Sequence, residues 1–119
     1  LSHILLTGAT SGIGAAMLAK LLADGHRVTA LARRATALAP QERLTALDCD
    51  LANPSELDAV LEILRSAPPF DIIINNAALQ SPLALLDPRF DPAMLMHEAG
   101  INLVAPARIA QALVPAMIA

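Results

Sequence analysis

Short apolar runs alternate along the chain with segments whose apolar residues recur every three or four positions. The short runs predict four strands, at residues 3–7, 27–32, 44–49 and 71–75. The fourth run is too uniformly apolar to have a solvent-exposed face, so we expect that strand to be buried. Strands that alternate with helices predict an α/β domain in which helices cover a parallel sheet.

The first predicted helix covers residues 12–23. Ile13, Met17 and Leu21 recur at a spacing of four and predict its buried stripe. Gly25 follows at the position where a glycine commonly ends a helix.

Two further helices are predicted to begin with a capping side chain followed by proline. Asn53 precedes Pro54, and Asp91 precedes Pro92. The last helix is expected to run to the end of the chain, with an interruption between residues 100 and 106.

Composition narrows the class of protein. The 119 residues are 55% hydrophobic and 16% charged, which excludes disorder and allows one domain over residues 1–119. A net charge of −3 without a basic cluster argues against a nucleic-acid partner. The single cysteine allows no internal disulfide, so we expect a reducing, cytoplasmic location. No apolar run approaches the roughly 18–20 residues that span a bilayer, so no membrane partner is expected.

The stretch TGATSGIG at residues 7–14 joins the first strand to the first helix. Gly8 follows the strand, and Gly12 and Gly14 open the helix. Free backbone N–H groups and the positive end of a helix would hold a phosphate there, and glycines let it approach. The alternative is a turn whose glycines serve tight packing only. No Gly-Lys-Ser/Thr follows, which disfavours ATP or GTP, so the loop predicts a dinucleotide site.

The end of the second strand bears on which dinucleotide binds. NAD-binding folds commonly place an acid there, but this strand ends at Ala32 and continues with Arg33 and Arg34. An arginine binds a 2′-phosphate that a carboxylate would repel. The pattern therefore favours NADP over NAD, and the alternative is a pair of solvated loop arginines.

Taken together, these motifs resemble the classical short-chain dehydrogenase/reductase family. TGATSGIG matches its TGxxxGxG loop, and Asp50-Leu51 match the acidic position after the third strand. Asn75-Asn76-Ala77-Ala78 match its NNAG motif with alanine in place of glycine, and Asn102 matches the asparagine of its long helix. The four motifs are in the family's order and cover essentially the whole chain.

The resemblance implies a three-layer, Rossmann-type, doubly wound parallel sheet with strand order 3-2-1-4, incomplete at the carboxyl end of the chain. It implies a nicotinamide cofactor, a small carbonyl or alcohol substrate, and homo-oligomers. The implied site residues are Gly8, Ser11, Gly12, Ile13 and Gly14 at the pyrophosphate, Arg33 at the 2′-phosphate, Asp50 and Leu51 at the adenine, Asn76, Ala77 and Ala78 at the ribose, and Asn102 in a proton relay.

The residues themselves leave some of these roles open. Asp50 would accept a hydrogen bond from adenine or cap a turn beside Asn53. Asn76 would face a ligand or only stabilise its own turn. Ala78 would replace glycine without strain unless its φ is positive.

Pro106 lies four residues after Asn102 and has no N–H to donate to the Asn102 carbonyl, so a kink is expected there. The resemblance implies that this carbonyl holds a water linked to the active-site lysine. The alternative is an ordinary kinked core helix.

The family's chemistry needs a serine, a tyrosine and a lysine, the last two in a YxxxK motif. This chain has no tyrosine, and Lys20 is its single lysine. We therefore expect residues 1–119 alone to be inactive and to form the cofactor half of an oxidoreductase. The alternative is a non-catalytic dinucleotide-binding or interaction module. The three histidines and Cys49 have no zinc-type spacing, so no metal is expected.

Overall fold

The computed structural model describes the whole chain, from Leu1 to Ala119. Its four strands form one parallel sheet in the order β3-β2-β1-β4, as predicted. The strands are β1 (His3–Thr7), β2 (Arg27–Ala32), β3 (Leu44–Asp48) and β4 (Ile72–Ile74).

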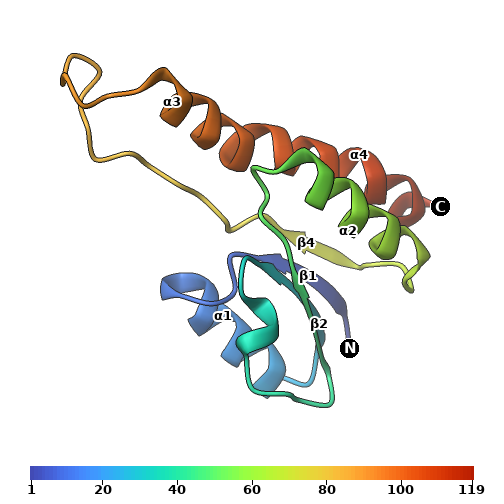
Figure 1. Cartoon of the computed structure of the whole chain (residues 1–119). Coiled ribbons are helices and arrows are strands. Elements are labelled where there is room, and N and C mark those ends of the chain that lie inside the picture. The colour runs from blue at the N-terminus through green and yellow to red at the C-terminus, as the bar shows by residue number, and fades with distance from the viewer.

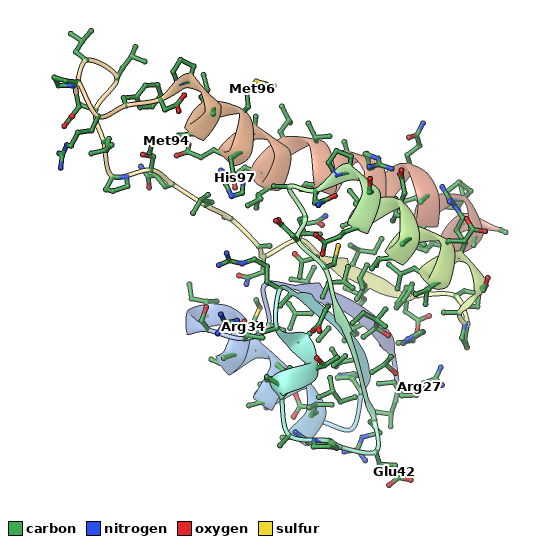
Figure 2. The ribbon with its side chains drawn as sticks, viewed as in Figure 1. Arg27, Arg34, Glu42, Met94, Met96 and His97 are labelled. Carbon is green, nitrogen blue, oxygen red and sulfur yellow. The ribbon has the colours of Figure 1, made fainter.

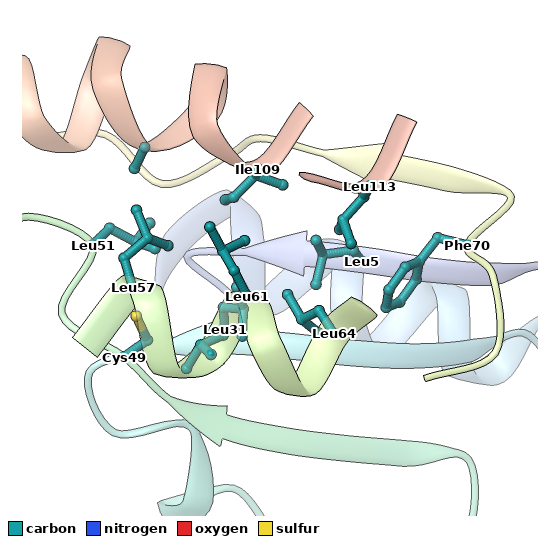
Figure 3. Packing of buried hydrophobic residues seen from close by; sticks show 12 residues of the cluster. Leu5, Leu31, Cys49, Leu51, Leu57, Leu61, Leu64, Phe70, Ile109 and Leu113 are labelled. Carbon is teal, nitrogen blue, oxygen red and sulfur yellow. The ribbon is translucent and has the colours of Figure 1, made fainter. Parts of the chain in front are cut away.

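Helices cover both faces of the sheet, which gives the predicted three layers (Figure 1). Helix α1 (Gly12–Ala23) lies on one face, and α2 (Pro54–Ser66) and α4 (Ala105–Ile118) lie on the other. Alternate strand residues point to opposite faces. On the α2 and α4 side, Leu5 and Leu31 pack against Leu57, Leu61, Leu64, Ile109 and Leu113 (Figure 3).

The predicted caps are confirmed. The Asn53 side chain accepts hydrogen bonds from the backbone N–H groups of Ser55 and Glu56, at 3.0 and 3.2 Å. The Asp91 side chain accepts one from Ala93 at 2.9 Å and opens helix α3 (Pro92–Ala99). Each cap satisfies N–H groups that a helix leaves without an internal partner.

The buried stripe of α1 was predicted one position too early. Gly14, Leu18 and Leu22 are buried, whereas Ile13 is 75% exposed. The helix packs closely on the end of β1, where a Cβ built on Gly14 would lie 1.8 Å from the carbonyl oxygen of Gly8. The rotation that places Gly14 against this carbonyl turns Ile13 outward.

The prediction that the fourth strand is buried was wrong. Ile72 is 43% exposed, and Ile73 and Ile74 are only half-buried. Strand β4 is an outer strand whose single neighbour is β1, so one of its edges has no partner.

The predicted interruption of the last helix takes the form of a π-helical turn, η2 (Gly100–Val104), between α3 and α4. Ala105 donates its N–H to the Gly100 carbonyl five residues back, just before Pro106, which has no N–H. The helix is therefore continuous from Pro92 to Ile118. These 27 residues are long and apolar enough to cross a membrane by length and composition alone, which corrects the expectation that no segment is. Ala105, Ile109 and Leu113 nevertheless pack on α2 and the sheet as in a core helix.

Candidate functional site

A cavity of about 830 Å³ opens at the carboxyl ends of the strands. Its walls come from the segments that follow all four strands, together with the end of β2, the start of α1, and residues of α3 and η2. The volume lies within the range of roughly 300–1,000 Å³ that small-molecule sites occupy. The predicted cofactor residues that line it are Gly8, Ser11, Ile13, Gly14, Arg33, Asp50, Leu51, Asn76, Ala77 and Ala78. Gly12 and Asn102 are not part of the lining.

The loop after β1 has the backbone that an anion site requires. Gly8 adopts φ of 69°, which L side chains rarely adopt. The first turn of α1 contains no acidic residue, and the Ser11 side chain makes no capping hydrogen bond. The positive end of the helix and its first N–H groups therefore face the cavity without a competing carboxylate.

A buried hydroxyl joins this loop to the segment after β4. Thr7 is 1% exposed, and its Oγ1 accepts the backbone N–H groups of Asn76 and Ala77, at 3.1 and 3.0 Å. Asn76 Nδ2 donates to the Gly8 carbonyl at 3.1 Å. Asn76 therefore connects the loop after β4 to the loop after the neighbouring strand β1. Neither of its predicted roles had included this contact.

Arg33 and Arg34 lie on the cavity wall directly after β2, and both are exposed. Four ion pairs occur in the chain, and neither arginine takes part in any of them. Figure 2 shows Arg34 at the cavity end of the sheet and Arg27 at the opposite end. The rim of the cavity thus holds two positive charges without an acidic partner.

Asp50 forms a local turn, the alternative that its sequence position had left open. Its Oδ1 accepts the N–H of Ala52 at 3.0 Å, and its own N–H donates to the Glu56 carboxylate at 3.2 Å. Cys49 beside it is buried, and burial, with Glu56 and Asp50 adding to it, raises the pKa of the thiol to about 11. The thiol at the floor of the cavity is therefore protonated and unreactive near neutral pH.

Asn102 fixes the loop that leads from β4 to α3. Its Oδ1 accepts the N–H of Leu79 at 2.8 Å, and its Nδ2 donates to the Leu79 carbonyl at 2.7 Å. The Glu98 carboxylate accepts the N–H of Ser81 in the same loop. No residue other than glycine has a positive φ, so Ala78 replaces glycine without strain.

Both the sequence and the fold of this chain are similar to those of known proteins. A family model described as short chain dehydrogenase matches residues 2–119. The chain belongs to the short-chain dehydrogenase family. It is 37% identical to a fatty acyl-CoA reductase of Mycobacterium tuberculosis, over 98% of this chain and 42% of that protein.

Solved structures of the family superpose on nearly the whole chain. A short-chain dehydrogenase from Sphingobium yanoikuyae in complex with NADPH is 31% identical, with a TM-score of 0.87 over 99% of this chain and 49% of its own. A 4-hydroxyisoleucine dehydrogenase complexed with NADH and succinate is 26% identical, with a TM-score of 0.85 over 97% of this chain and 52% of its own. This short-chain dehydrogenase chain thus spans about half the length of these relatives.

The family motifs did not reveal every residue that builds the site. The acceptor role of Thr7 and the pairing of Leu79 with Asn102 depend on contacts between segments more than 20 residues apart. His97 and Ile101 line the cavity from the long helix, and neither was among the predicted site residues. Their only signal was helical spacing, because a four-residue step puts both on one helix face. No group of three or more His, Cys, Asp or Glu residues could hold a metal ion.

Proposed function

We propose that the intact protein is an NADP(H)-dependent oxidoreductase that acts on a small carbonyl or alcohol. The observation that carries the choice of NADP is the pair Arg33 and Arg34 on the cavity wall, free of ion pairs. Ala32 stands where an NAD-binding fold would place an acid, so nothing at this point would repel a 2′-phosphate.

The cavity fits a dinucleotide on its own geometry. Gly12 has nothing within 4 Å of the place where a Cβ would lie, so the backbone there is open to an approaching pyrophosphate, whereas Gly8 and Gly14 let the loop, α1 and Asn76 pack closely behind it. Gly8, Ser11, Gly12, Ile13 and Gly14 would hold the pyrophosphate, Arg33 the 2′-phosphate, Asp50 and Leu51 the adenine, and Asn76, Ala77 and Ala78 the ribose.

The bound cofactor supplies or takes up the hydride. The residues of this chain would bind the cofactor and orient it. Asn76 is held by Gly8, and Thr7 holds the adjoining backbone N–H groups, so the ribose wall is fixed before a ligand arrives. Asn102 holds Leu79 in place, and we propose that its main-chain carbonyl supports the proton relay.

Removal of one arginine tests the proposal. Arg33→Ala should weaken NADP⁺ binding roughly 10- to 100-fold, which corresponds to the loss of a charged hydrogen bond of about 1.5–3 kcal/mol. Binding of NAD⁺ should change little, because NAD⁺ has no 2′-phosphate. Titration calorimetry measures both affinities, and Arg27→Ala, at the other end of β2, is the matched control. Equal losses for the two nucleotides would refute the choice of NADP.

Residues 1–119 are themselves proposed to be inactive. They contain no tyrosine, and Lys20 is an exposed residue of α1 whose ammonium pairs with Asp24 at 2.9 Å. Absorbance of NADPH, followed with a panel of aldehydes and ketones, should stay constant. If the intact protein behaves in the same way while it binds nucleotide, the alternative of a non-catalytic dinucleotide-binding or interaction module is correct.

We further propose that the intact protein works in the cytoplasm as a homo-oligomer. Leu95, Met96 and Leu103 support the assembly, since they are 56%, 73% and 70% exposed along one long helix. Light scattering on the intact protein should give a mass of two or four chains.

A further inference from the structure

A carboxylate stands opposite the strand end that leads into the two arginines, and it pairs with neither of them. Asp48 is the last residue of β3 and stands opposite Ala32, the last residue of β2. Arg33 and Arg34 follow directly. No ion pair joins either guanidinium to Asp48.

Both oxygens of this carboxylate are already bound. Asp48 Oδ1 accepts the backbone N–H of Thr36 at 2.9 Å, and Oδ2 accepts the Thr36 hydroxyl at 2.7 Å. These bonds, the backbone one first, hold the pKa of Asp48 below its usual value, so the group is a stable anion near neutral pH. Thr36 therefore provides each oxygen of a full negative charge with one neutral donor.

The short turn that carries Thr36 also carries the arginines. Ala35 is fully buried and begins the 3₁₀ helix η1 (Ala35–Ala37). Cys49 donates its N–H to the Ala32 carbonyl at 2.9 Å and so fixes the turn at its other end. Arg33 and Arg34 lie between these two anchors, with their side chains exposed on the cavity wall.

A free carboxylate at this position would act against a 2′-phosphate in two ways. It would attract a guanidinium group away from the ligand, and it would repel the ligand directly. We propose that the Thr36 hydroxyl is a specificity-determining group that occupies Asp48 and leaves Arg33 and Arg34 available to a nucleotide 2′-phosphate. This inference rests on the proposed NADP site and names a positioning residue within it.

Adenosine 2′,5′-bisphosphate and 5′-AMP are suitable probes, since they differ only in the 2′-phosphate. Titration calorimetry on the purified protein gives the ratio of their dissociation constants. Thr36→Val keeps the backbone bond to Oδ1 and frees Oδ2, so the preference for the bisphosphate should fall about fivefold. Thr36→Ser keeps the hydroxyl and should keep the preference. Thr45→Val, on the exposed part of β3, is a control for the loss of a threonine.

Removal of the charge separates this role from a structural one. In the double variant Thr36→Val with Asp48→Asn, the freed group is neutral, so the preference should return. Salt provides a second readout: the defect of Thr36→Val should shrink at 0.5 M NaCl, because exposed charges are screened.

Two results would overturn the inference: an unchanged ratio in Thr36→Val, which includes an equal weakening of both probes, or no recovery in the double variant. If the unaltered protein itself shows no preference for the bisphosphate, the proposed NADP function fails and this inference fails with it. A preference that Thr36→Val leaves intact removes only the inference.

Discussion

Two regions meet at the cavity, and they are held in different ways. The cradle, residues 7–14 with 76–77, is fixed by backbone contact and buried hydrogen bonds, since Thr7 and Gly14 are both buried. The arm, residues 78–104, has no buried residue. Leu86 in its loop is 92% exposed, and Figure 2 shows Met96 directed away from the body of the molecule.

The difference indicates where tolerance to substitution lies. The cradle has its shape before any ligand binds, because Gly14 packs on Gly8 and the hydrogen bonds of Thr7 and Asn76 join its two segments. The arm depends on a few side-chain to backbone bonds, mainly those of Asn102 and Glu98. Substitutions in the cradle should therefore lower global stability, and substitutions in the arm should act locally.

The largest effect is expected at Gly14. An alanine Cβ would lie 1.8 Å from the Gly8 oxygen and 2.6 Å from Asn76 Nδ2, so α1 would have to move off the sheet. Gly14→Ala should lower the free energy of unfolding by about 3 kcal/mol in urea denaturation. Gly12→Ala is the comparison, since its Cβ meets nothing within 4 Å and only its φ of 54° is strained. A Gly14→Ala variant as stable as Gly12→Ala would contradict a packed cradle.

A smaller loss is expected at Thr7. Thr7→Val keeps the shape but leaves the N–H groups of Asn76 and Ala77 without their acceptor. The free energy of unfolding should fall by about 2 kcal/mol, whereas Thr7→Ser should lose much less. If valine and serine behave alike in the same denaturation experiment, the hydroxyl does not hold the cradle.

The arm should respond more weakly. Asn102→Ala removes both bonds to Leu79, which is exposed, so a stability loss of about 1 kcal/mol is expected. Amide hydrogen exchange should accelerate around residues 79–83 and stay unchanged at 4–7. Faster exchange in β1 would show that arm and cradle are one cooperative unit.

The smallest effect near neutral pH is expected at Cys49, a buried residue of the cavity wall. A pKa of about 11 for Cys49, against 9.0 for the free thiol, leaves roughly 100-fold less thiolate at pH 8 in the folded chain. Iodoacetamide should therefore label folded protein about 100-fold more slowly than protein in urea. Because the folded pKa is the higher one, this thiol stabilises the fold fully below pH 9, and that contribution is lost as the pH rises toward 11. Equal labelling rates would place Cys49 in solvent.

Local signals in the sequence were sufficient for the alternation of strands and helices, the Asn53 and Asp91 caps and the position of the loop after β1, whereas the strand order came from the family resemblance. The local signals depend on neighbouring residues or on chain order. The rotation of α1 was not predictable in the same way, because the contact of Gly14 with Gly8 sets it and Ile13, Met17 and Leu21 suggested a better apolar stripe.

The same reason applies to the rest of the site. Pro106 indicated a disturbed helix, but it did not indicate that the disturbance is a π turn in which Ala105 donates to the Gly100 carbonyl. The roles of Thr7, Asn76 and Asn102 depend on partners 23 to 70 residues away, which periodicity does not identify. The exposure of Ile72 follows from its position at the sheet edge and not from its composition.

The central claim is that the cavity at the carboxyl ends of the strands holds the 2′-phosphorylated dinucleotide. Hydrogen–deuterium exchange with and without saturating NADP⁺ tests it most directly. Protection should appear at residues 8–14, 31–36, 49–51 and 76–79 and be absent from the opposite end of the sheet around Arg27, Arg43 and Pro68. Protection at that opposite end, or none anywhere at a concentration that saturates the calorimetric signal, would contradict the account.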